Sequence, residues 1–394
     1  MAGEEQTKTG LETQNGPKKK KKKKTAGAPQ TGRKKLSKKA MLARKKRLRK
    51  KRIRRVVGRI ALSLVTFLVV VLGGVYALLS VFFLGPSQTA GDKLTMSLFE
   101  TSALKFVPSL YYSQAEIDAI KDRNKIIEPE GTTDLSLVSI RRPEEQTDQT
   151  GADAQQEEED IYVEEITGAT YHGWMMVVRD PSRVSVGVSR DYFNDDARGM
   201  RIAEMAEKYN AIGAINGGAF SDSGGMGNGG MPSGLTVSDG EIRNSSGGRD
   251  LTTAGFTEDD ILVVGKFTKD QAKEMKIRDA CSFGPALVVN GEPVEFSGAS
   301  SGLNPRTAIG QRADGAVLML VIDGRQVTSM GAKYQDLVDI MLRYGAVNAC
   351  NLDGGSSSLM WFGDGYVNNC ASVIGIRPVP TTFLVLKEGA STNG

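Results

Sequence analysis

Histidine and cysteine are scarce in this sequence of 394 residues, which has one histidine and three cysteines. A Ser-His-Asp triad would have to use His172, and no G-x-S-x-G motif is present. The cysteines Cys281, Cys350 and Cys370 lack the spacing of zinc ligands. They allow at most one disulfide, for which Cys350–Cys370 is one possibility and a buried, inert Cys350 the favoured alternative. Most catalysis based on histidine or cysteine is therefore excluded.

Charge is absent from the 25 residues between Ile60 and Leu84. A helix of this length spans about 37 Å, enough to cross a hydrocarbon core of about 30 Å. A cleaved signal peptide is the alternative, but this apolar run and the basic segment before it are both too long for one. The sequence therefore predicts an uncleaved transmembrane helix over residues 60–84.

The net charge of +5 conceals two regions of opposite sign. Residues 1–59 hold 24 basic and three acidic residues, a net of +21, which leaves the rest of the chain at −16. An acidic body repels phosphate, so we expect no nucleic-acid partner. The basic residues precede the apolar run, and positive charge stays in the cytoplasm. The N-terminus is therefore expected in the cytoplasm and the body outside the cell membrane.

The basic tail contains seven consecutive lysines from Lys18 to Lys24. Like charges at this density repel one another and cannot form a core, so residues 1–59 are expected to be a disordered tail. The tail acts either as a topology signal, the favoured interpretation, or as a ligand for anionic lipid headgroups.

Composition divides the remaining chain into segments. Residues 85–140 read as a partly helical stalk outside the membrane, in which Ser113 and Glu116 form a helix start. Residues 141–160 are an acidic linker without large apolar residues. Residues 161–388 have the patterning of one folded domain, and residues 389–394 are expected to be disordered.

Two parts of the expected domain share one plan. A helix over 201–208 precedes an apolar run at 211–215, and a helix over 334–344 precedes another at 346–350. Each run ends in asparagine and soon reaches a glycine pair. A further apolar run at 316–322 suggests a strand–helix–strand unit with the second pair. Together with the expected strands 171–178 and 184–188, this predicts an α+β (mixed α/β) domain with a central sheet and flanking helices.

Carboxylates, amides, one arginine and many glycines follow these expected strands. Polar groups at the carboxyl ends of such strands commonly form a site, and this set suits glycosyl chemistry. Alternatives remain open, because an Asp-Gly pair can simply make a turn, an arginine can form a structural ion pair, and the glycines can serve tight turns only. The candidates are Asn216, Asp222, Arg306, Asp323, Asn351, Asp353 and Ser356.

An ordered set of motifs resembles the phosphodiester glycosidase family over about residues 165–387. The motifs include NGGAF (216–220), Gly284-Pro285, NPRTAIG (304–310), VIDGR (321–325) and NLDGGSSS (351–358), after Tyr171-His172-Gly173 and Asp180-Pro181-Ser182-Arg183-Val184. One departure is visible, because relatives commonly have a third glycine where this sequence has Ser356. The resemblance maps family motifs onto Asn216, Gly217, Gly218, Arg306, Thr307, Asp323, Asn351, Asp353, Gly354, Gly355 and Ser356.

The resemblance implies hydrolysis of a glycosyl phosphodiester. In that case Asp353 is expected to be the nucleophile or general base and Asp323 the partner carboxylate. Arg306 and the N–H groups of the glycine loops are expected to hold the phosphate charge. The substrate would be a cell-surface or exopolysaccharide-type glycan, since bacterial relatives are often labelled exopolysaccharide-biosynthesis proteins. We expect no cofactor and no metal.

Two other functions remain open. One is a non-catalytic protein of the same fold that binds sugar-phosphate polymers of the cell envelope. The other is a structural envelope protein whose basic tail recruits a cytoplasmic partner.

Overall fold

The computed structural model describes most of the chain in separate ranges. The described residues are 37–99, 104–128, 133–140, 160–193, 198–221, 228–246, 251–296, 302–372 and 375–391. The lysine run, the expected linker except Asp160, and Asp222 lie outside them, as do residues 392–394. The chain divides into two units, Met1–Gly73 and Gly74–Gly394.

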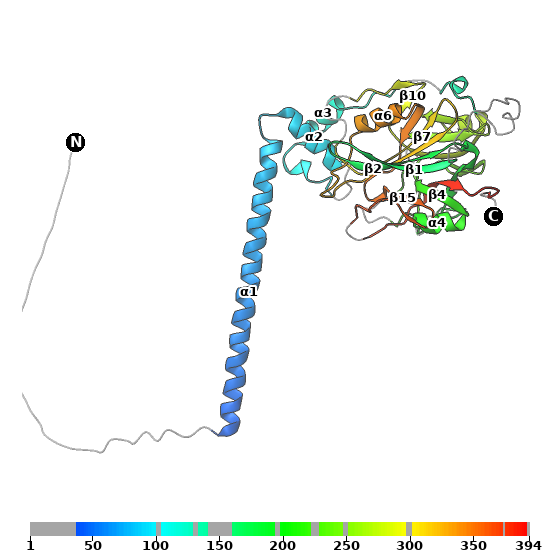
Figure 1. The fold of residues 1–394 in the computed structure, drawn as a ribbon. Coiled ribbons are helices and arrows are strands. Elements are labelled where there is room, and N and C mark those ends of the chain that lie inside the picture. Colours follow the sequence, from blue (N-terminus) through cyan, green and yellow to red (C-terminus); the bar gives the residue numbers. More distant parts are fainter. Residues whose placement is uncertain are drawn as a thin grey trace, which may run out of the picture. The chain divides into compact units, whose positions relative to one another are not determined.

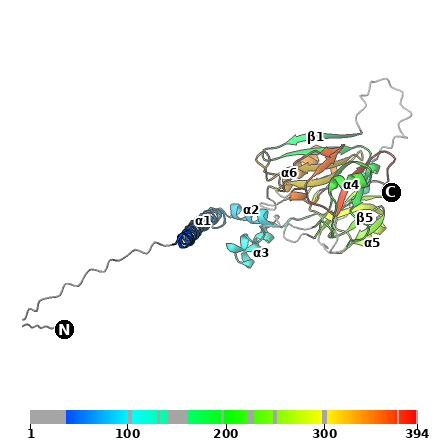
Figure 2. The same ribbon diagram turned by 90° about the horizontal axis from the view of Figure 1, so that it is seen from below.

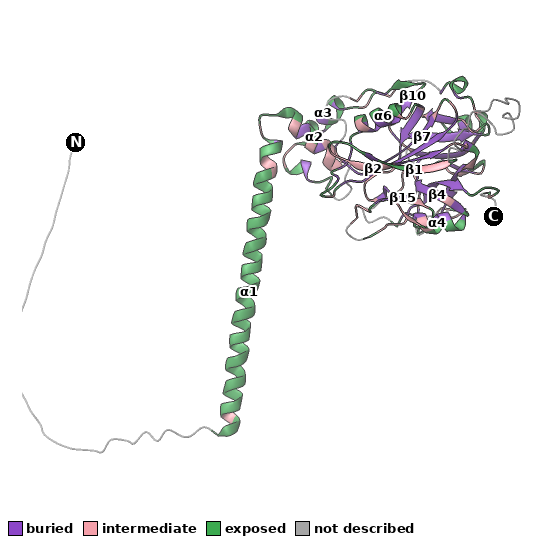
Figure 3. Cartoon of the chain, viewed as in Figure 1, coloured by how far each residue is buried: buried purple, intermediate pink, exposed green. Residues whose placement is uncertain are grey.

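The helix α1 covers Lys38–Phe83 and includes all of the uncharged run except its last residue, Leu84. It is long and apolar enough to cross a membrane, and its side chains are exposed along nearly its entire length (Figure 3). The helix begins 22 residues before Ile60, where a disordered tail was expected. That expectation failed because residues 38–59 contain only one glycine and no proline, so a helix nucleated in the apolar run propagates backward through lysine, arginine and leucine.

Two short helices follow α1. They are α2 (Gln88–Phe99) and α3 (Gln114–Arg123), with the 3₁₀ turn η1 (Pro108–Leu110) before α3. The predicted helix start is confirmed, because Ser113 and Glu116 form a reciprocal capping box. Arg123 pairs with Asp92 at 3.0 Å and ties α3 to α2. The stalk is thus partly helical, as expected.

The chain from Asn124 onward lies against the folded domain. The hydroxyl of Thr133 bonds both the N–H and the carbonyl of Val264. The turn η2 (Leu135–Leu137) follows, and Ser139 N donates to Ala313 O at 2.8 Å. The described parts of residues 124–140 therefore pack on the domain as well as leading to it.

The domain contains three antiparallel sheets among the described residues. The first sheet is ordered β1 (Ile161–Thr167), β2 (His172–Val178), β13 (Val317–Ile322), β12 (Arg306–Arg312), β14 (Ala346–Asn351), β10 (Ala286–Val289) and β11 (Glu292–Pro293). The second is ordered β16 (Gly365–Tyr366), β15 (Met360–Phe362), β4 (Ala211–Asn216), β17 (Thr381–Leu386) and β3 (Val184–Val188). The third is ordered β6 (Glu241–Asn244), β5 (Thr236–Ser238), β9 (Ile277–Phe283), β7 (Thr252–Thr257) and β8 (Leu262–Gly265).

Helices cover the outer faces of the first two sheets. The helix α6 (Tyr334–Arg343) packs its apolar side on one face of the first sheet. The other face of that sheet shares a core with the second and third sheets. The helix α4 (Ile202–Lys208) packs on the far side of the second sheet, so α6 and α4 lie at opposite sides of the domain (Figure 1). The short helix α5 (Lys269–Glu274) lies beside β5 (Figure 2).

The α+β prediction is confirmed, and most expected elements are present within a residue or two. The expected strand–helix–strand unit is β13–α6–β14, with one change. The strand β12 lies between β13 and β14 and is antiparallel to both, so β13 and β14 run in the same direction without touching. Sequence periodicity could not show this insertion, because it depends on pairing between distant segments.

Candidate active site

The ends of three neighbouring strands meet at one edge of the first sheet. Because β12 is antiparallel to both neighbours, its first residues lie beside the last residues of β13 and β14. The register pairs Arg306 with Ile322 and Ala308 with Asn351. This topology brings the start of NPRTAIG, the VIDGR turn and the NLDGGSSS loop to the same edge.

Asn216 joins the second sheet to this edge. It is fully buried at the end of β4, and its side-chain oxygen accepts a hydrogen bond from the hydroxyl of Thr307 at 2.7 Å. Its amide nitrogen donates to the carbonyl of Asp353 at 2.6 Å. Asp353 N in turn donates to Gly217 O at 3.2 Å. Four of the predicted site residues, from three separate motifs, are therefore in direct contact.

The carboxylate of Asp353 is partly exposed where the two sheets meet. Its Oδ1 accepts a hydrogen bond from Gly354 N at 3.0 Å, which orients the side chain at the start of the Gly-Gly turn. A second hydrogen bond holds the turn against residue 305, because Gly355 N donates to Pro305 O at 2.9 Å. A Cβ on Gly354 would stand 2.9 Å from that same oxygen, so only glycine fits there without movement.

The other glycine pair is needed for close packing. A Cβ on Gly217 would stand 2.6 Å from the Thr381 hydroxyl, and one on Gly218 would stand 2.7 Å from Ser282 O. Both N–H groups donate to Thr381, through its carbonyl and its hydroxyl. Since all four glycine N–H groups of the two pairs bond within the protein, the phosphate-holding role expected of them gains no support.

Arg306 lies on the opposite face of β12 from Thr307. Its guanidinium is stacked over the Tyr334 ring of α6 at 4.2 Å. It donates to the carbonyls of Gly302 and Ala332, and only 4% of the residue is exposed. These contacts favour a structural role that holds the loops around residues 302 and 332, so the catalytic role of Arg306 stays a prediction.

Asp323 directly follows β13 and is 3% exposed. Its carboxylate accepts hydrogen bonds from the amides of Asn368 at 2.8 Å and Asn369 at 3.5 Å. Burial raises the pKa of Asp323, although those amides and the charge of His172 oppose the rise. The Asn368 amide also donates to Ser358 O, which connects Asp323 to the NLDGGSSS loop. The structure thus places both predicted carboxylates at one edge, and the pKa of Asp323 is raised above its ordinary value.

Two arginines that the sequence analysis did not assign flank the Gly-Gly turn. The guanidinium of Arg325 lies 3.4–3.7 Å from the point where a Cβ on Gly355 would stand, and it donates to Asn304 Oδ1. Arg377 donates to Ser356 Oγ at 3.3 Å and stacks over the Phe220 ring at 4.7 Å.

A sequence signal existed for Arg325. It is the last residue of the VIDGR motif. In the structure Arg325 has a φ of +58°, a conformation that costs energy for a residue with a Cβ and that is concentrated at functional sites. No comparable signal marked Arg377, which lies shortly before β17.

The NLDGGSSS loop carries polar atoms that the fold does not use. Asn351 donates to Gly284 O at 2.7 Å, but its Oδ1 is buried and has no hydrogen-bond partner among the described residues. The same is true of the hydroxyls of Ser357 and Ser358. Buried polar atoms of this kind are uncommon in native proteins and indicate bonding to water or to a ligand.

The histidine and the cysteines have structural surroundings. His172 pairs with Glu165 across the β1–β2 hairpin and packs against Trp174. All three cysteines are free, so the possible Cys350–Cys370 disulfide is wrong. Burial raises the pKa of the Cys350 thiol far above its ordinary value and that of Cys281 to about 12, which leaves both inert. Among the described residues, no three His, Cys, Asp or Glu side chains are grouped to hold a metal.

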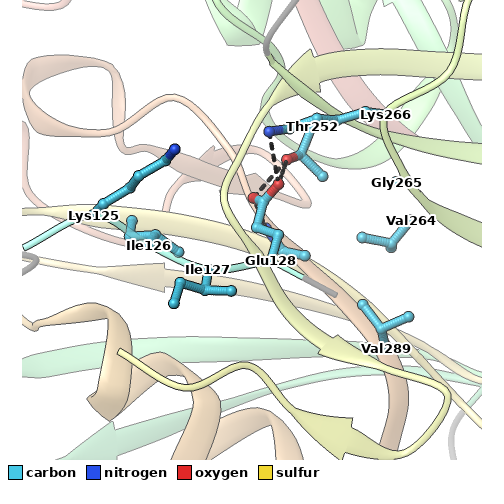
Figure 4. Close-up of a pocket in the computed structure, with 10 residues that line it drawn as sticks. Lys125, Ile126, Ile127, Glu128, Thr252, Val264, Gly265, Lys266 and Val289 are labelled. Carbon is cyan, nitrogen blue, oxygen red and sulfur yellow. Dashed lines mark hydrogen bonds and ion pairs between the residues drawn. The ribbon is translucent and has the colours of Figure 1, made fainter. Parts of the chain in front are cut away.

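A cavity of about 640 Å³ lies away from these residues, between the 125–128 segment and the edges of β7, β8 and β10. The carboxylate of Glu128 projects into it and accepts hydrogen bonds from Thr252 Oγ1 at 2.7 Å and Ala286 N at 2.9 Å (Figure 4). It also forms an ion pair with Lys266, whose Nζ lies 3.3 Å from Glu128 Oε2. Its described lining contains none of the predicted site residues. The contacts of Glu128 fasten the chain before the domain to the domain itself.

Comparison with known proteins places this domain. Residues 209–386 match the family model described as phosphodiester glycosidase, which confirms the resemblance carried by the motifs. The SPbeta prophage-derived uncharacterized protein YomE of Bacillus subtilis (strain 168) is 30% identical over 205 residues, covering 48% of this chain and 30% of that protein. The chain therefore spans less than a third of the length of that relative.

Solved structures show weaker similarity. The catalytic domain of zebrafish N-acetylglucosamine-1-phosphodiester alpha-N-acetylglucosaminidase, auto-inhibited by its pro-peptide, is 21% identical, with a TM-score of 0.47 over 58% of this chain and 82% of that chain. A putative exported protein from Burkholderia pseudomallei is 17% identical, with a TM-score of 0.43 over 55% and 74% of the two chains.

Proposed function

Since residues 209–386 are a domain of the phosphodiester glycosidase family, we propose that this chain is a membrane-anchored hydrolase that cleaves a sugar-1-phosphodiester bond in cell-surface or exopolysaccharide-type glycans. The observation that carries the proposal is the turn of Asp353 to Ser356. It carries the partly exposed residue Asp353 at its start, and the guanidinium groups of Arg325 and Arg377 lie beside its residues Gly355 and Ser356.

The leaving group determines which protein groups the reaction needs. Cleavage breaks the bond between the sugar C1 and the phosphodiester oxygen, and the phosphate leaves as a monoester with the bonding electron pair. Its negative charge increases as the bond breaks. Guanidinium groups bind phosphate oxygens in a bidentate way and stabilise such charge. We assign this task to Arg325 and Arg377, and we assign to Arg306 the positioning of the loops beneath them.

The two carboxylates have different environments and so different tasks. Asp353 is partly exposed and acts on C1, either as the nucleophile or as the base that takes a proton from the attacking water. Asp323 is buried, which raises its pKa, and we assign to it the proton that the leaving oxygen receives. In both routes the water oxygen ends on C1. In the nucleophilic route the proton of the water that hydrolyses the intermediate returns to Asp323, whereas in the other route it goes to Asp353, and exchange with solvent then restores both carboxyl groups. NMR of the first-formed sugar anomer separates the two routes, because the nucleophilic route retains the configuration and the other inverts it.

The membrane anchor is α1. Its apolar residues 60–83 cross the bilayer, and the basic residues before them hold the N-terminus in the cytoplasm. The domain then acts outside the cell membrane, where glycans of this kind are found.

Turnover of the full chain on a panel of nucleotide sugars and sugar-1-phosphodiesters tests the activity. We expect release of reducing sugar, and a loss of about 10²- to 10⁴-fold in kcat for Asp353→Asn. Asp364→Asn is the matched control, because Asp364 is an exposed carboxylate in the β15–β16 turn. Undiminished turnover by a folded Asp353→Asn variant would contradict the assignment. Saturable glycan binding without turnover by the unaltered chain would favour the non-catalytic alternative.

A further inference from the structure

The segment between α2 and α3 folds back onto the end of the apolar helix. The Tyr111 hydroxyl donates to Tyr76 O at 2.9 Å, and its ring stacks on both Tyr76 and Phe83, with centroids 5.1 and 4.5 Å apart. The Tyr112 hydroxyl donates to Phe83 O, and its ring meets Phe83 edge-on. Gly91 leaves room for this contact, since a Cβ there would stand 2.6 Å from the Tyr112 hydroxyl.

These contacts set the depth of the segment relative to α1. Tyr76 and Phe83 are seven residues apart, which corresponds to about 10 Å along a helix. Tyr111 therefore lies alongside the last two turns of the apolar run and not beyond its end. Tyrosine is enriched at the level where a bilayer meets water, because its ring is apolar and its hydroxyl is polar.

The residues just before Tyr111 expose large apolar side chains. Leu104 is 41% exposed, Phe106 is 60% exposed and Leu110 is 58% exposed. Val107 and Pro108 between them are buried, so the segment is ordered against the protein and turns its other side chains outward. Val81, Phe82 and Leu84 at the end of α1 are also exposed. Adjacent exposed apolar residues of this size mark a surface that binds another phase or molecule.

We infer that residues 104–112, here named the tyrosine clip, dip into the outer interface of the lipid bilayer beside α1. The inference rests on the membrane anchoring in the proposed function. Tyr111 and Tyr112 hold the clip against the end of α1, so the clip meets the bilayer only if α1 crosses it. The bilayer covers Leu104, Phe106 and Leu110, and the polar helix α3 begins where the chain returns to water at Ser113. The chain thus has two attachments to the membrane, a span and an interfacial segment.

Spin labels on the full chain in phosphatidylcholine–phosphatidylglycerol vesicles test this inference. Cys370→Ser provides the background, because Cys281 and Cys350 are 1% and 0% exposed and will not label. Single cysteines are then introduced as Phe106→Cys, as Val70→Cys in α1 and as Tyr192→Cys in the domain, where Tyr192 is 88% exposed. Collisions with oxygen, which concentrates in lipid, are compared with collisions with a water-soluble nickel chelate.

We expect the oxygen-to-nickel collision ratio at position 106 to exceed that at position 192 several-fold and to approach that at position 70. A ratio at position 106 equal to that at 192, with position 70 still in lipid, overturns the clip and leaves the anchor intact. A water-like ratio at position 70 overturns both the anchor and the clip. Low collision rates with both reagents at position 106 overturn the clip in favour of a protein contact. None of these readouts depends on turnover, so the glycosidase proposal stands or fails separately.

Discussion

Two buried aspartates show how one residue type serves two purposes in this domain. Asp279 on β9 is 2% exposed, and Asp323 after β13 is 3% exposed. Burial raises the pKa of both, that of Asp279 to about 6. Asp279 accepts hydrogen bonds from Val186 N at 2.8 Å and from the guanidinium of Arg278, and so joins the third sheet to β3. Asp323 is faced by the neutral amides of Asn368 and Asn369.

The difference lies in what surrounds the charge. Asp279 has a cation beside it, and Arg278 is itself fixed by Asp260 at 2.9 Å and by two carbonyl groups. Removing either partner of this buried ion pair leaves the other charge uncompensated and lowers the stability of the fold. No ion pair reaches Asp323 in the part of the chain that the structure describes, and its amide neighbours bond either protonation state. Burial without a fixed cation therefore distinguishes the carboxyl group that can exchange a proton from the one that holds sheets together.

The largest effect is expected from Asp323→Asn. The amide keeps the shape and one acceptor for Asn368 but cannot give up a proton, so kcat should fall at least about 100-fold. The thermal midpoint should change little, because the hydrogen-bond partners of the Asp323 carboxylate are the neutral amides of Asn368 and Asn369. Steady-state kinetics and thermal unfolding of the same preparation measure both quantities. A variant that loses stability and keeps its turnover would reverse the roles assigned to the two aspartates.

The same substitution at position 279 should act in the opposite way. The amide nitrogen of Asp279→Asn points a donor at Arg278 or at Val186 N, leaving a buried donor unsatisfied at a cost of about 2 kcal/mol in the free energy of unfolding. Turnover per folded molecule should stay within twofold of the unaltered chain. Urea unfolding, with kcat corrected for the folded fraction, is the measurement. An unchanged free energy of unfolding would show that the contacts of Asp279 do not hold the second and third sheets together.

The two raised pKa values also predict distinct pH dependences. Folding binds the Asp279 proton more tightly than the unfolded chain does, so its contribution to stability is greatest at low pH. That contribution is lost between the unfolded pKa of about 4 and the folded value of about 6. The free energy of unfolding of the unaltered chain should therefore decline with rising pH across this window, and the decline should be smaller in Asp279→Asn.

Turnover depends on pH through the other carboxyl group. As a proton donor, Asp323 is active while protonated, so kcat should fall as pH rises through its raised pKa. This limb of the pH profile should be absent from the residual activity of Asp323→Asn. A limb that persists in the variant would assign the proton to another group.

The smallest effect is expected at Ser356, where relatives commonly have glycine. Ser356→Gly removes the hydroxyl that accepts from Arg377, so the guanidinium loses one fixed position above the turn. We expect KM to rise about threefold to tenfold, in keeping with the net value of one hydrogen bond to a charged group, while kcat changes less. Substrate titration against both proteins measures this. An unchanged KM would show that the Ser356 hydroxyl does not position Arg377 for the substrate.

Elements with strong local periodicity were predictable from the sequence. The strands at 184–188 and 211–216 and the helix at 334–343 were expected within one or two residues of their bounds. These elements depend on residues close together in the chain. Asn216 and Asp353 were expected at one site because both follow predicted strands, whereas Thr307 was expected only through the family resemblance.

Features set by distant contacts were not predictable. The insertion of β12 depends on pairing with two strands at once. The sequence could not show that N–H groups of the glycine pairs donate to acceptors within the protein, among them Thr381 and Pro305. The phosphate-binding role of Arg306 stays a prediction. The sequence could not show that its side chain lies over Tyr334, because this depends on which face of β12 the helix α6 covers. Arg325 and Arg377 reach the turn only through loop conformations.

The position of β17 has a consequence for how this domain is made. Residues 381–386 pair with β3 on one side and with β4 on the other, so the second sheet is completed by the strand that is synthesised last. Before β17 pairs, β3 has no partner in this sheet and β4 is paired only with β15, and unpaired strand edges invite aggregation. Completion of the second sheet therefore depends on its most C-terminal strand, and the open edges of β3 and β4 need protection until β17 is in place.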